Sequence, residues 1–263
     1  MVAQTISLPN IRKLFIPDPG FYIAEVDLAG AEAQVVAWEA GDEDLKQAFR
    51  SGVNVHIKNA RDVFANKVKG WSDEAIHATS YPGGIYYTAK RCIHATHNGG
   101  LPKGLASQIT GLSISDATNF QKLWFGLHPK IKARQEYILD CLNGRIENNP
   151  ARTIFNRFGY RIVFFDRIKN VFTEALTWVQ QSTIGICCFK GGIEIRKQVP
   201  WAQVLLQVHD SLVFQFPIDK YDQLPKLKKA IHSVIVPYDD PLKIPWTLKV
   251  SKKSWGDAED IKW

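Results

Sequence analysis

The chain lacks several features that mark whole classes of protein. None of its apolar stretches approaches the roughly 20 residues that a membrane-spanning helix needs. Met1 to Ile11 has neither the basic start nor the apolar run of a signal peptide. The four cysteines form no CxxC motif, and adjacent Cys187 and Cys188 are poor partners for a disulfide bond. We therefore expect a cytoplasmic protein with reduced cysteines and no membrane partner.

Four common catalytic motifs are also missing. Gly99 to Gly104 has the glycine spacing of a nucleotide-binding GxxxxGK[ST] loop, but Leu105 stands where the lysine is required. No GxGxxG, HExxH or GxSxG motif occurs. These absences disfavour P-loop ATPases, Rossmann dehydrogenases, zinc proteases of the HExxH type and α/β-hydrolases.

What the chain does have is a globular composition with an excess of positive charge. Of its 263 residues 45% are hydrophobic, and 33 basic residues against 26 acidic ones give a net charge of +7. Such an excess favours a polyanionic partner such as nucleic acid, although many basic proteins have none. Each basic cluster is by itself typical of a solvated surface, but together they could neutralise phosphates. The clusters are Arg12-Lys13, Lys130/Lys132/Arg134, Lys226/Lys228/Lys229 and Lys249/Lys252/Lys253.

Hydrophobic patterning places strands at both ends of the chain and helices between them. The predicted strands are 21–28, a hairpin within 151–165, two strands within 202–216, and 246–250. The predicted helices are 30–38, 43–49, 57–64, 88–96, 115–125, 131–142, 168–189 and 221–234. This order predicts an α+β fold, in which an antiparallel sheet carries an inserted, mainly helical subdomain.

Two aspartates are candidates for metal binding. Asp27 and Asp210 each lie at the edge of an apolar strand, where an unpaired charge is costly. If the two strands are neighbours, their carboxylates could hold Mg²⁺ for phosphoryl chemistry. The simpler interpretation also stays open: Asp27 caps the following helix, and Asp210 is an ordinary turn residue.

The segment Tyr86 to Gly100 is a second candidate site. At 100° per residue, a helix places Tyr86, Lys90, His94 and His97 on roughly one face, suited to gripping a phosphate and a base or sugar. A solvated lysine is the alternative. The spacing His94-x-x-His97 is also compatible with a metal ion, but no third ligand is evident.

Taken together, these motifs resemble the catalytic region of family A DNA polymerases, most closely the bacteriophage branch. VDLAGAEAQVVAWEAGDEDLKQAF with the following NVH is similar to the first palm motif. AKRCIHATHNGG is similar to the fingers helix, and LQVHDSLVF to the last palm motif. TIFNRFGYR and WVQQST are similar to the hairpin and glutamine segments between them. The resemblance runs from about Leu8 to Trp263.

The resemblance implies a role for each matching residue. Asp27, Asp210 and the backbone carbonyl of Leu28 would bind two Mg²⁺ ions, for which Mn²⁺ can substitute. The residues implied to bind the dNTP are Lys90, His56, His94, Arg91 and Glu32. Among these, Glu32 would exclude the ribose 2′-hydroxyl. His209, Gln181 and Arg157 would contact the primer–template DNA.

The sequence also departs from the family pattern. Tyr86 and Tyr87 stand where an arginine for the terminal phosphates is usual, a loss that Arg91 could compensate. Asn98 replaces a tyrosine, and Ser211 replaces a glutamate. The implied palm is 1–48 with 150–263, and the implied fingers are 49–149. No segment matches the thumb or exonuclease domains of the family.

The resemblance therefore implies templated addition of dNTPs to a primer 3′ end. One alternative is that the chain is one subunit of a split polymerase with a separate thumb or exonuclease polypeptide. Another is a catalytically silent, polymerase-derived DNA-binding or replisome scaffold protein, and a metal-dependent nuclease is a third.

Overall fold

The computed structural model describes residues 9–263, which divide into two compact units. Among these residues, one unit joins 9–31 and 183–263, and the other is 32–182. The segment considered for a signal peptide falls mostly on the first eight residues, outside the described part. Among the described residues, no helix is long and apolar enough to cross a membrane.

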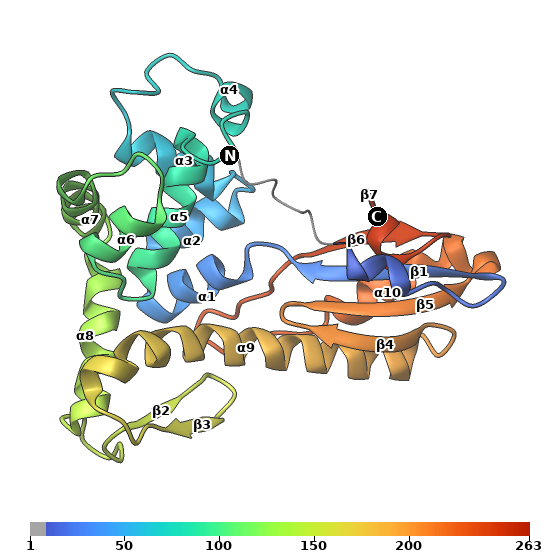
Figure 1. The fold of residues 1–263 in the computed structure, drawn as a ribbon. Coiled ribbons are helices and arrows are strands. Elements are labelled where there is room, and N and C mark those ends of the chain that lie inside the picture. Colours follow the sequence, from blue (N-terminus) through green and yellow to red (C-terminus); the bar gives the residue numbers. More distant parts are fainter. Residues whose placement is uncertain (1–8) are drawn as a thin grey trace. The chain divides into compact units, whose positions relative to one another are not determined.

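The unit formed by the two ends of the sequence contains a five-stranded antiparallel sheet in the order β4-β5-β1-β6-β7 (Figure 1). Its strands are β1 (Phe21–Leu28), β4 (Gln203–Val208), β5 (Ser211–Pro217), β6 (Trp246–Ser251) and β7 (Glu259–Ile261). Its helical elements are η1 (Ile11–Leu14), η2 (Ile218–Gln223), α10 (Leu224–Ile231), η3 (Trp255–Asp257) and residues 183–198 of α9 (Ile168–Gln198). β1 is the central strand in this order. Its apolar side chains are therefore buried on both faces of the sheet.

The two faces of this sheet differ in chemistry because successive side chains of a strand point to opposite sides. On one face Val26 lies opposite Leu212 on β5 and Leu248 on β6. α9 packs closely here: a Cβ atom at Gly191 would lie 3.2 Å from the Trp246 ring. The side chains that alternate with these point to the other face of the sheet. That face carries polar side chains, among them that of Asp27.

The second unit is mainly helical. Its elements are α1 (Ala31–Ala40, from Glu32 onward), α2 (Glu43–Arg50), α3 (Val55–Val63), α4 (Asp73–His77), α5 (Ile85–His97), α6 (Pro102–Gln108), α7 (Ile114–Leu127), α8 (Pro129–Asn143), the hairpin β2 (Thr153–Phe155) and β3 (Arg161–Val163), and residues 168–182 of α9. One apolar cluster in this unit joins α3 to α5 through Ile57, Ala60 and Ala89. Another joins α8, β2 and α9 through Ile138, Ile154 and Leu176. The first of these clusters holds α5 against α3.

Local sequence signals explain where these helices begin and end. Asp42, Asn54 and Ser72 accept hydrogen bonds from backbone N–H groups at the starts of α2, α3 and α4. Ser113 and Asp116 form a capping box at the start of α7. Gly144 ends α8 with φ +70°, a left-handed conformation that glycine adopts without steric cost.

The predicted α+β class is confirmed, and most predicted elements are present with shifted ends. The helix expected over 221–234 is wrong at its start: the turn η2 comes first, and α10 follows with Pro225 in its first turn, where a missing N–H is tolerated. α9 continues to Gln198, well beyond the predicted end. α4, α6 and β7 were not expected, since each is short and lacks a clear period.

The compact units divide the chain at other points than the palm and fingers boundaries expected from the resemblance. α1, α2 and the hairpin β2–β3 belong to the helical unit, because their contacts lie there. Lys130 on α8 donates to the carbonyl of Gly41, and Arg157 in the hairpin turn forms an ion pair with Glu39 on α1. The palm and fingers boundaries remain a prediction.

Candidate functional site

The structure brings Asp27 and Asp210 together. Asp27 is near the end of β1, and Asp210 lies in the two-residue turn that joins β4 to β5. Antiparallel pairing sets Asp27 opposite Ser211, and the Leu28 N–H donates to the Asp210 carbonyl at 3.0 Å. Besides burial, the neighbouring charge of Asp210 raises the pKa of Asp27, so the two side chains lie near each other. Asp27 lies within β1, and Gly30 directly precedes α1, so Asp27 does not stand at the N-cap position of that helix.

Burial, followed by the neighbouring charges of Asp210 and Glu25, raises the pKa of Asp27 to about 6, whereas Lys249 opposes this rise. Glu25 is nearly buried on the same face of β1 and lies 3.7 Å from the Arg12 guanidinium. The site therefore concentrates negative charge where water is partly excluded.

This donor set fits a divalent cation. Carboxylates that repel each other in a half-buried site are stabilised when a cation binds to them. Mg²⁺ binds through one or two carboxylates and completes its coordination with water and substrate phosphates. Burial raises the pKa of the Cys188 thiol, as do Cys187, Asp210 and Asp27, so this cysteine stays protonated and does not compete as a ligand.

The backbone at this turn is strained. His209, the first residue of the turn, has φ +52°, a conformation that few residues other than glycine adopt. Such strain is characteristic of tight hairpins and of functional sites, where the surrounding sheet fixes it. It leaves the His209 side chain exposed next to Asp210.

The helical unit brings together a second group of predicted residues. His94 on α5 places Nδ1 3.4 Å from Oε2 of Glu32 on α1. The His94 ring lies 5.7 Å from that of His56 on α3, which in turn meets Tyr86 edge-on at 6.0 Å. Burial lowers the pKa of His56 to about 4, with smaller effects of Lys90 and His94. His56 is therefore a neutral imidazole at ordinary pH.

Lys90 and Arg91 are the exposed cations of α5. Lys90 forms no ion pair with any residue in 9–263, so its ammonium group is available to an anion. The Arg91 guanidinium lies over the Tyr87 ring, 5.7 Å from its centre, which restricts its motion. His97 follows the same helical period, but it is 3% exposed, and burial lowers its pKa well below the usual value, so its ring is not accessible to a ligand.

The neighbouring glutamines of α9 have different environments. Gln180 is buried and donates to Asn98 Oδ1 at 2.8 Å, which ties it to the end of α5. Gln181 is exposed. Of the two, Gln181 is therefore the one available to a ligand, in keeping with the sequence-based choice.

Sequence reasoning missed one grouping of basic residues. Arg157 lines a cavity of ≈ 590 Å³ together with Lys130, Arg134 and Tyr137. Arg134 is 6% exposed and donates to the Leu176 carbonyl, so it does not belong to a solvated face. Helical spacing could have indicated this, because Lys130 and Arg134 are one turn apart on α8 while Lys132 points elsewhere, toward Glu136.

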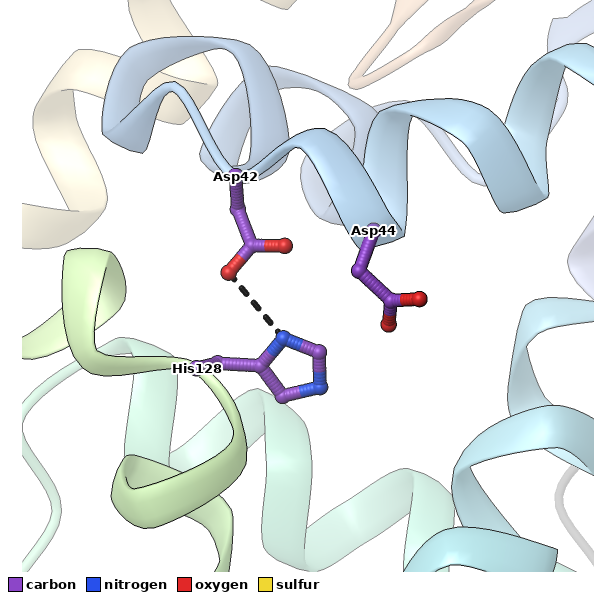
Figure 2. Close-up of side chains that lie close together, drawn as sticks. All are labelled: Asp42, Asp44 and His128. Atoms are coloured by element: carbon purple, nitrogen blue, oxygen red, sulfur yellow. Dashed lines mark hydrogen bonds and ion pairs between the residues drawn. The ribbon is translucent and has the colours of Figure 1, made fainter.

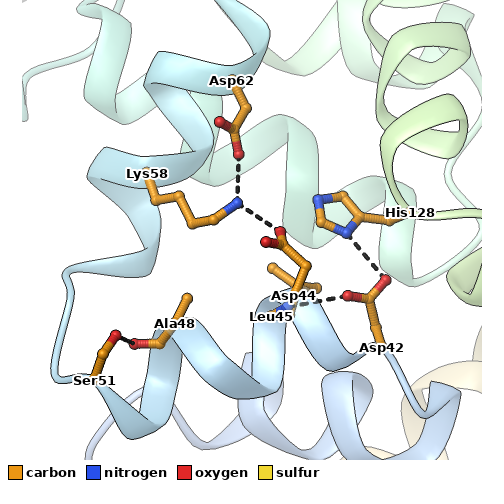
Figure 3. A network of polar contacts seen from close by, with 8 residues as sticks. All are labelled: Asp42, Asp44, Leu45, Ala48, Ser51, Lys58, Asp62 and His128. Carbon is orange, nitrogen blue, oxygen red and sulfur yellow. Dashed lines mark hydrogen bonds and ion pairs between the residues drawn. The ribbon is translucent and has the colours of Figure 1, made fainter.

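Among residues 9–263, one group of three potential metal ligands lies outside these sites. Figure 2 shows the side chains of Asp42, Asp44 and His128, whose candidate ligand atoms are within 4.8 Å of one another. Each carboxylate already has partners (Figure 3): Asp42 caps Leu45 and lies 3.0 Å from His128 Nδ1, and Asp44 lies 2.6 Å from the Lys58 ammonium. We interpret the group as a structural network that joins α2, α3 and the start of α8.

Two neighbouring carboxylates that can hold divalent ions are compatible with a class of protein that transfers phosphoryl groups with metal ions. The comparison with protein families narrows this class. The model of DNA polymerase family A matches residues 3–257, so the chain belongs to that family. The resemblance deduced from the motifs is thereby confirmed.

Relatives of known identity agree. The thermostable DNA polymerase I of Thermus filiformis is 28% identical over 245 residues, which are 89% of this chain and 27% of that protein. The DNA polymerase of Mycobacterium phage D29 is 26% identical over 258 residues, 97% of this chain and 38% of that protein. The chain thus spans only about a quarter to two fifths of these relatives' lengths.

A solved structure shares the fold. It is the POL domain of Pol1 from M. smegmatis, in complex with DNA primer-template and dNTP. The superposition covers 97% of this chain and 45% of that chain, with a TM-score of 0.74 and 18% sequence identity.

Proposed function

We propose that this chain is the part of a DNA polymerase that adds dNTPs to the 3′ end of a primer by a two-metal mechanism. The observation that carries the proposal is the pair of neighbouring carboxyl groups, Asp27 and Asp210, at the junction of β1 with the β4–β5 turn. In this proposal residues 1–48 and 150–263 act as the palm, and 49–149 act as the fingers.

The side chains of Asp27 and Asp210 and the backbone carbonyl of Leu28 would hold two Mg²⁺ ions, with Mn²⁺ as a substitute. Bound ions of this kind neutralise phosphate charge and ease deprotonation of the primer 3′-hydroxyl. The protein prepares the site by keeping two like charges close in a half-buried position. Ion binding would therefore relieve the repulsion between the two carboxylates.

The residues of the helical unit would hold the nucleotide. Lys90 and Arg91 would donate to the phosphates, where negative charge develops during transfer. Neutral His56 would offer a hydrogen bond without adding charge, and His94 would lie beside the sugar. Glu32 would close the sugar pocket to a ribose 2′-hydroxyl.

Contacts to the DNA would come from Gln181, His209 and Arg157. Base pairing with the template would select the incoming nucleotide, while these side chains fix the position of the duplex. A separate polypeptide that carries a thumb or an exonuclease is a further proposed partner.

Primer extension tests the proposal. The wild-type chain with primer–template, dNTPs and Mg²⁺ is expected to lengthen the primer, whereas Asp210→Asn is expected to lose at least about 10³-fold in rate. Asp222→Asn, an exposed aspartate in η2, is the matched control and should extend normally. Equal rates for Asp210→Asn and the wild type would remove Asp210 from the mechanism.

The same assay separates the alternatives. Extension that rises strongly when host or phage lysate is added supports a split polymerase. Salt-sensitive DNA binding without incorporation supports a silent scaffold, a reading that the replacement of the usual arginine by Tyr86 and Tyr87 favours. Shortened primers indicate a nuclease.

A further inference from the structure

The cavity of ≈ 590 Å³ in the helical unit is formed by three elements that are distant in the sequence. These are the end of α1, the helix α8 and the hairpin β2–β3. On α8 the lining residues recur every three or four positions from Lys130 to Ile138, so one face of this helix forms the floor. The volume lies in the range of about 300–1,000 Å³ that is usual for ligand pockets.

The wall of this cavity carries more positive than negative charge. Among the described residues that line it, Lys130, Arg134 and Arg157 are basic, and Glu39 alone is acidic. Oε1 of Glu39 lies 3.5 Å from Nε of Arg157, and the Lys130 ammonium donates to the carbonyl of Gly41 at 2.9 Å. These contacts keep both cations at the cavity. The excess of basic groups favours an anionic ligand.

Two aromatic rings of the same cavity are exposed to solvent. Tyr137 on α8 is 52% exposed, and Phe155 on β2 is 44% exposed. The register of the hairpin explains the exposure of Phe155. Ile154 pairs with Ile162, and both pack in the apolar cluster of α8 and α9, so Phe155 and its partner Arg161 point to the opposite face. Exposed rings that gather at a cavity are typical of a binding site.

The hydroxyl group of Tyr137 lies near the charged groups of the wall. Burial and then Cys141 raise the pKa of this hydroxyl, whereas Arg157 lowers it and Glu39 raises it. The phenol therefore stays neutral at ordinary pH. The cavity thus presents a neutral aromatic ring close to a guanidinium group.

We propose that this cavity binds an unpaired nucleotide of single-stranded DNA, with the base against Tyr137 or Phe155 and the phosphate beside Lys130. Sites for single strands combine cations that follow the backbone with aromatic rings on which bases stack. In a duplex the bases already stack on one another and offer these rings no free face. The inference rests on the proposed function in taking DNA as the partner, and it adds the single-stranded form and the residues that receive its bases.

Binding of a fluorescein-labelled oligo(dT) to the full chain, without Mg²⁺ or dNTPs, tests the inference by fluorescence anisotropy. Tyr137→Leu and Phe155→Leu should each weaken binding about tenfold, the effect of one lost stack between a base and a ring. Tyr137→Phe keeps the ring and should bind as the wild type does. Tyr81→Leu is the matched control, since Tyr81 is a 60% exposed tyrosine of the same unit outside the cavity, and it should also leave binding unchanged.

An abasic oligomer of the same length separates stacking from charge. The wild type should bind it at least about tenfold more weakly than oligo(dT), and Tyr137→Leu should weaken this binding no further. Lys130→Gln should weaken the binding of both oligomers, and should reduce the slope of log affinity against log salt by about 0.7. The affinity for a blunt duplex should be the same in Tyr137→Leu and the wild type.

Photocrosslinking gives a readout on the unaltered chain. An oligonucleotide that contains iododeoxyuridine should crosslink to Tyr137 or Phe155, as mapped by mass spectrometry, and crosslinks confined to other residues overturn the inference. It is also overturned if both leucine variants bind oligo(dT) as the wild type does, or if they lose as much affinity for the abasic oligomer. A chain that binds oligo(dT) as expected but never extends a primer refutes the proposed function and supports this site.

Discussion

Asp27 is proposed to bind metal ions, and its position in the fold disfavours the charged form of its carboxyl group. In the folded protein its carboxyl is half-buried next to two other carboxyl groups, and its pKa is raised from 3.8 to about 6. The folded state therefore binds this proton more tightly than the unfolded state does. Its contribution to stability is largest below about pH 4 and is lost as the pH rises toward 6.

Replacing Asp27 by Asn should remove this pH dependence. At pH 8 we expect Asp27→Asn to unfold with a free energy higher than the wild type by on the order of 1 kcal/mol, less than the full shift implies because water screens a half-buried group. Urea unfolding between pH 4 and pH 8 measures the difference. The same variant should not extend primers, and parallel pH curves for the two proteins would contradict the assigned environment.

At the scale of single elements, the start of α2 depends on one side chain. Asp42 is 5% exposed, caps Leu45 through one oxygen and meets His128 through the other. Burial works against the charged form of Asp42, but these hydrogen bonds outweigh it and lower its pKa. The network thereby links α2 to the residue that precedes α8.

Asp42→Ala should therefore destabilise the protein by about 2–3 kcal/mol, the sum of a lost helix cap and an unpaired buried histidine. Asp44→Asn is the matched control: it is exposed and loses mainly its ion pair with Lys58, so about 0–1 kcal/mol is expected. Thermal unfolding measures both. Adding Zn²⁺ should leave the wild-type midpoint unchanged, and a clear increase would show that the network is a metal site.

The backbone at the start of α5 leaves no room for a side chain at Gly84. A Cβ atom at Gly84 would lie 2.1 Å from the backbone oxygen of Thr79, whose hydroxyl accepts from the Tyr86 N–H. A side chain here must displace the backbone that holds the first turn of α5.

Gly84→Ala should accordingly cost about 1–3 kcal/mol in the free energy of unfolding and weaken dNTP binding, since Lys90 and His94 lie on this helix. Gly104→Ala in α6 is the control, because a Cβ atom there meets no atom within 4 Å. This replacement should raise the free energy of unfolding by about 0.5–1 kcal/mol. Denaturant titration of both variants decides the matter. Two glycine replacements with the same effect would argue against a close approach at Gly84.

At the scale of the whole molecule, the net charge of +7 would favour the proposed binding to DNA. Binding to phosphates releases counterions, so affinity for primer–template should fall at least about tenfold between 50 and 200 mM salt. Arg157→Gln should reduce the slope of log affinity against log salt by about one. Lys226→Gln on α10, with its ammonium near Gln223, should leave it unchanged. Fluorescence anisotropy over a salt series measures these slopes, and a flat wild-type curve would rule out phosphate binding.

Structural features that depend on residues close together in the sequence could be predicted, whereas those that depend on distant residues could not. β1 and the β4–β5 hairpin were predictable because apolar alternation and a turn are local signals, and the motif order indicated that Asp27 and Asp210 belong together. Partners set by tertiary packing were not predictable. Nothing near Glu32 in the sequence indicates His94, and nothing near Arg157 indicates Glu39. Likewise, His97 follows the helical period of its neighbours, but its ring is buried against that of Trp124, with ring centres 5.6 Å apart.

The pairing of β1 with β5 and β6 also determines when the carboxyl pair can exist during synthesis. β1 is translated before the helical unit, whereas the strands that flank it on both sides are translated after that unit. The helical unit can therefore fold while β1 still lacks its hydrogen-bonding partners. Contacts between such distant parts of a chain form slowly. A translation product interrupted before β5 would hold the helices that carry Lys90 and His94 but lack the neighbouring carboxyl groups of Asp27 and Asp210.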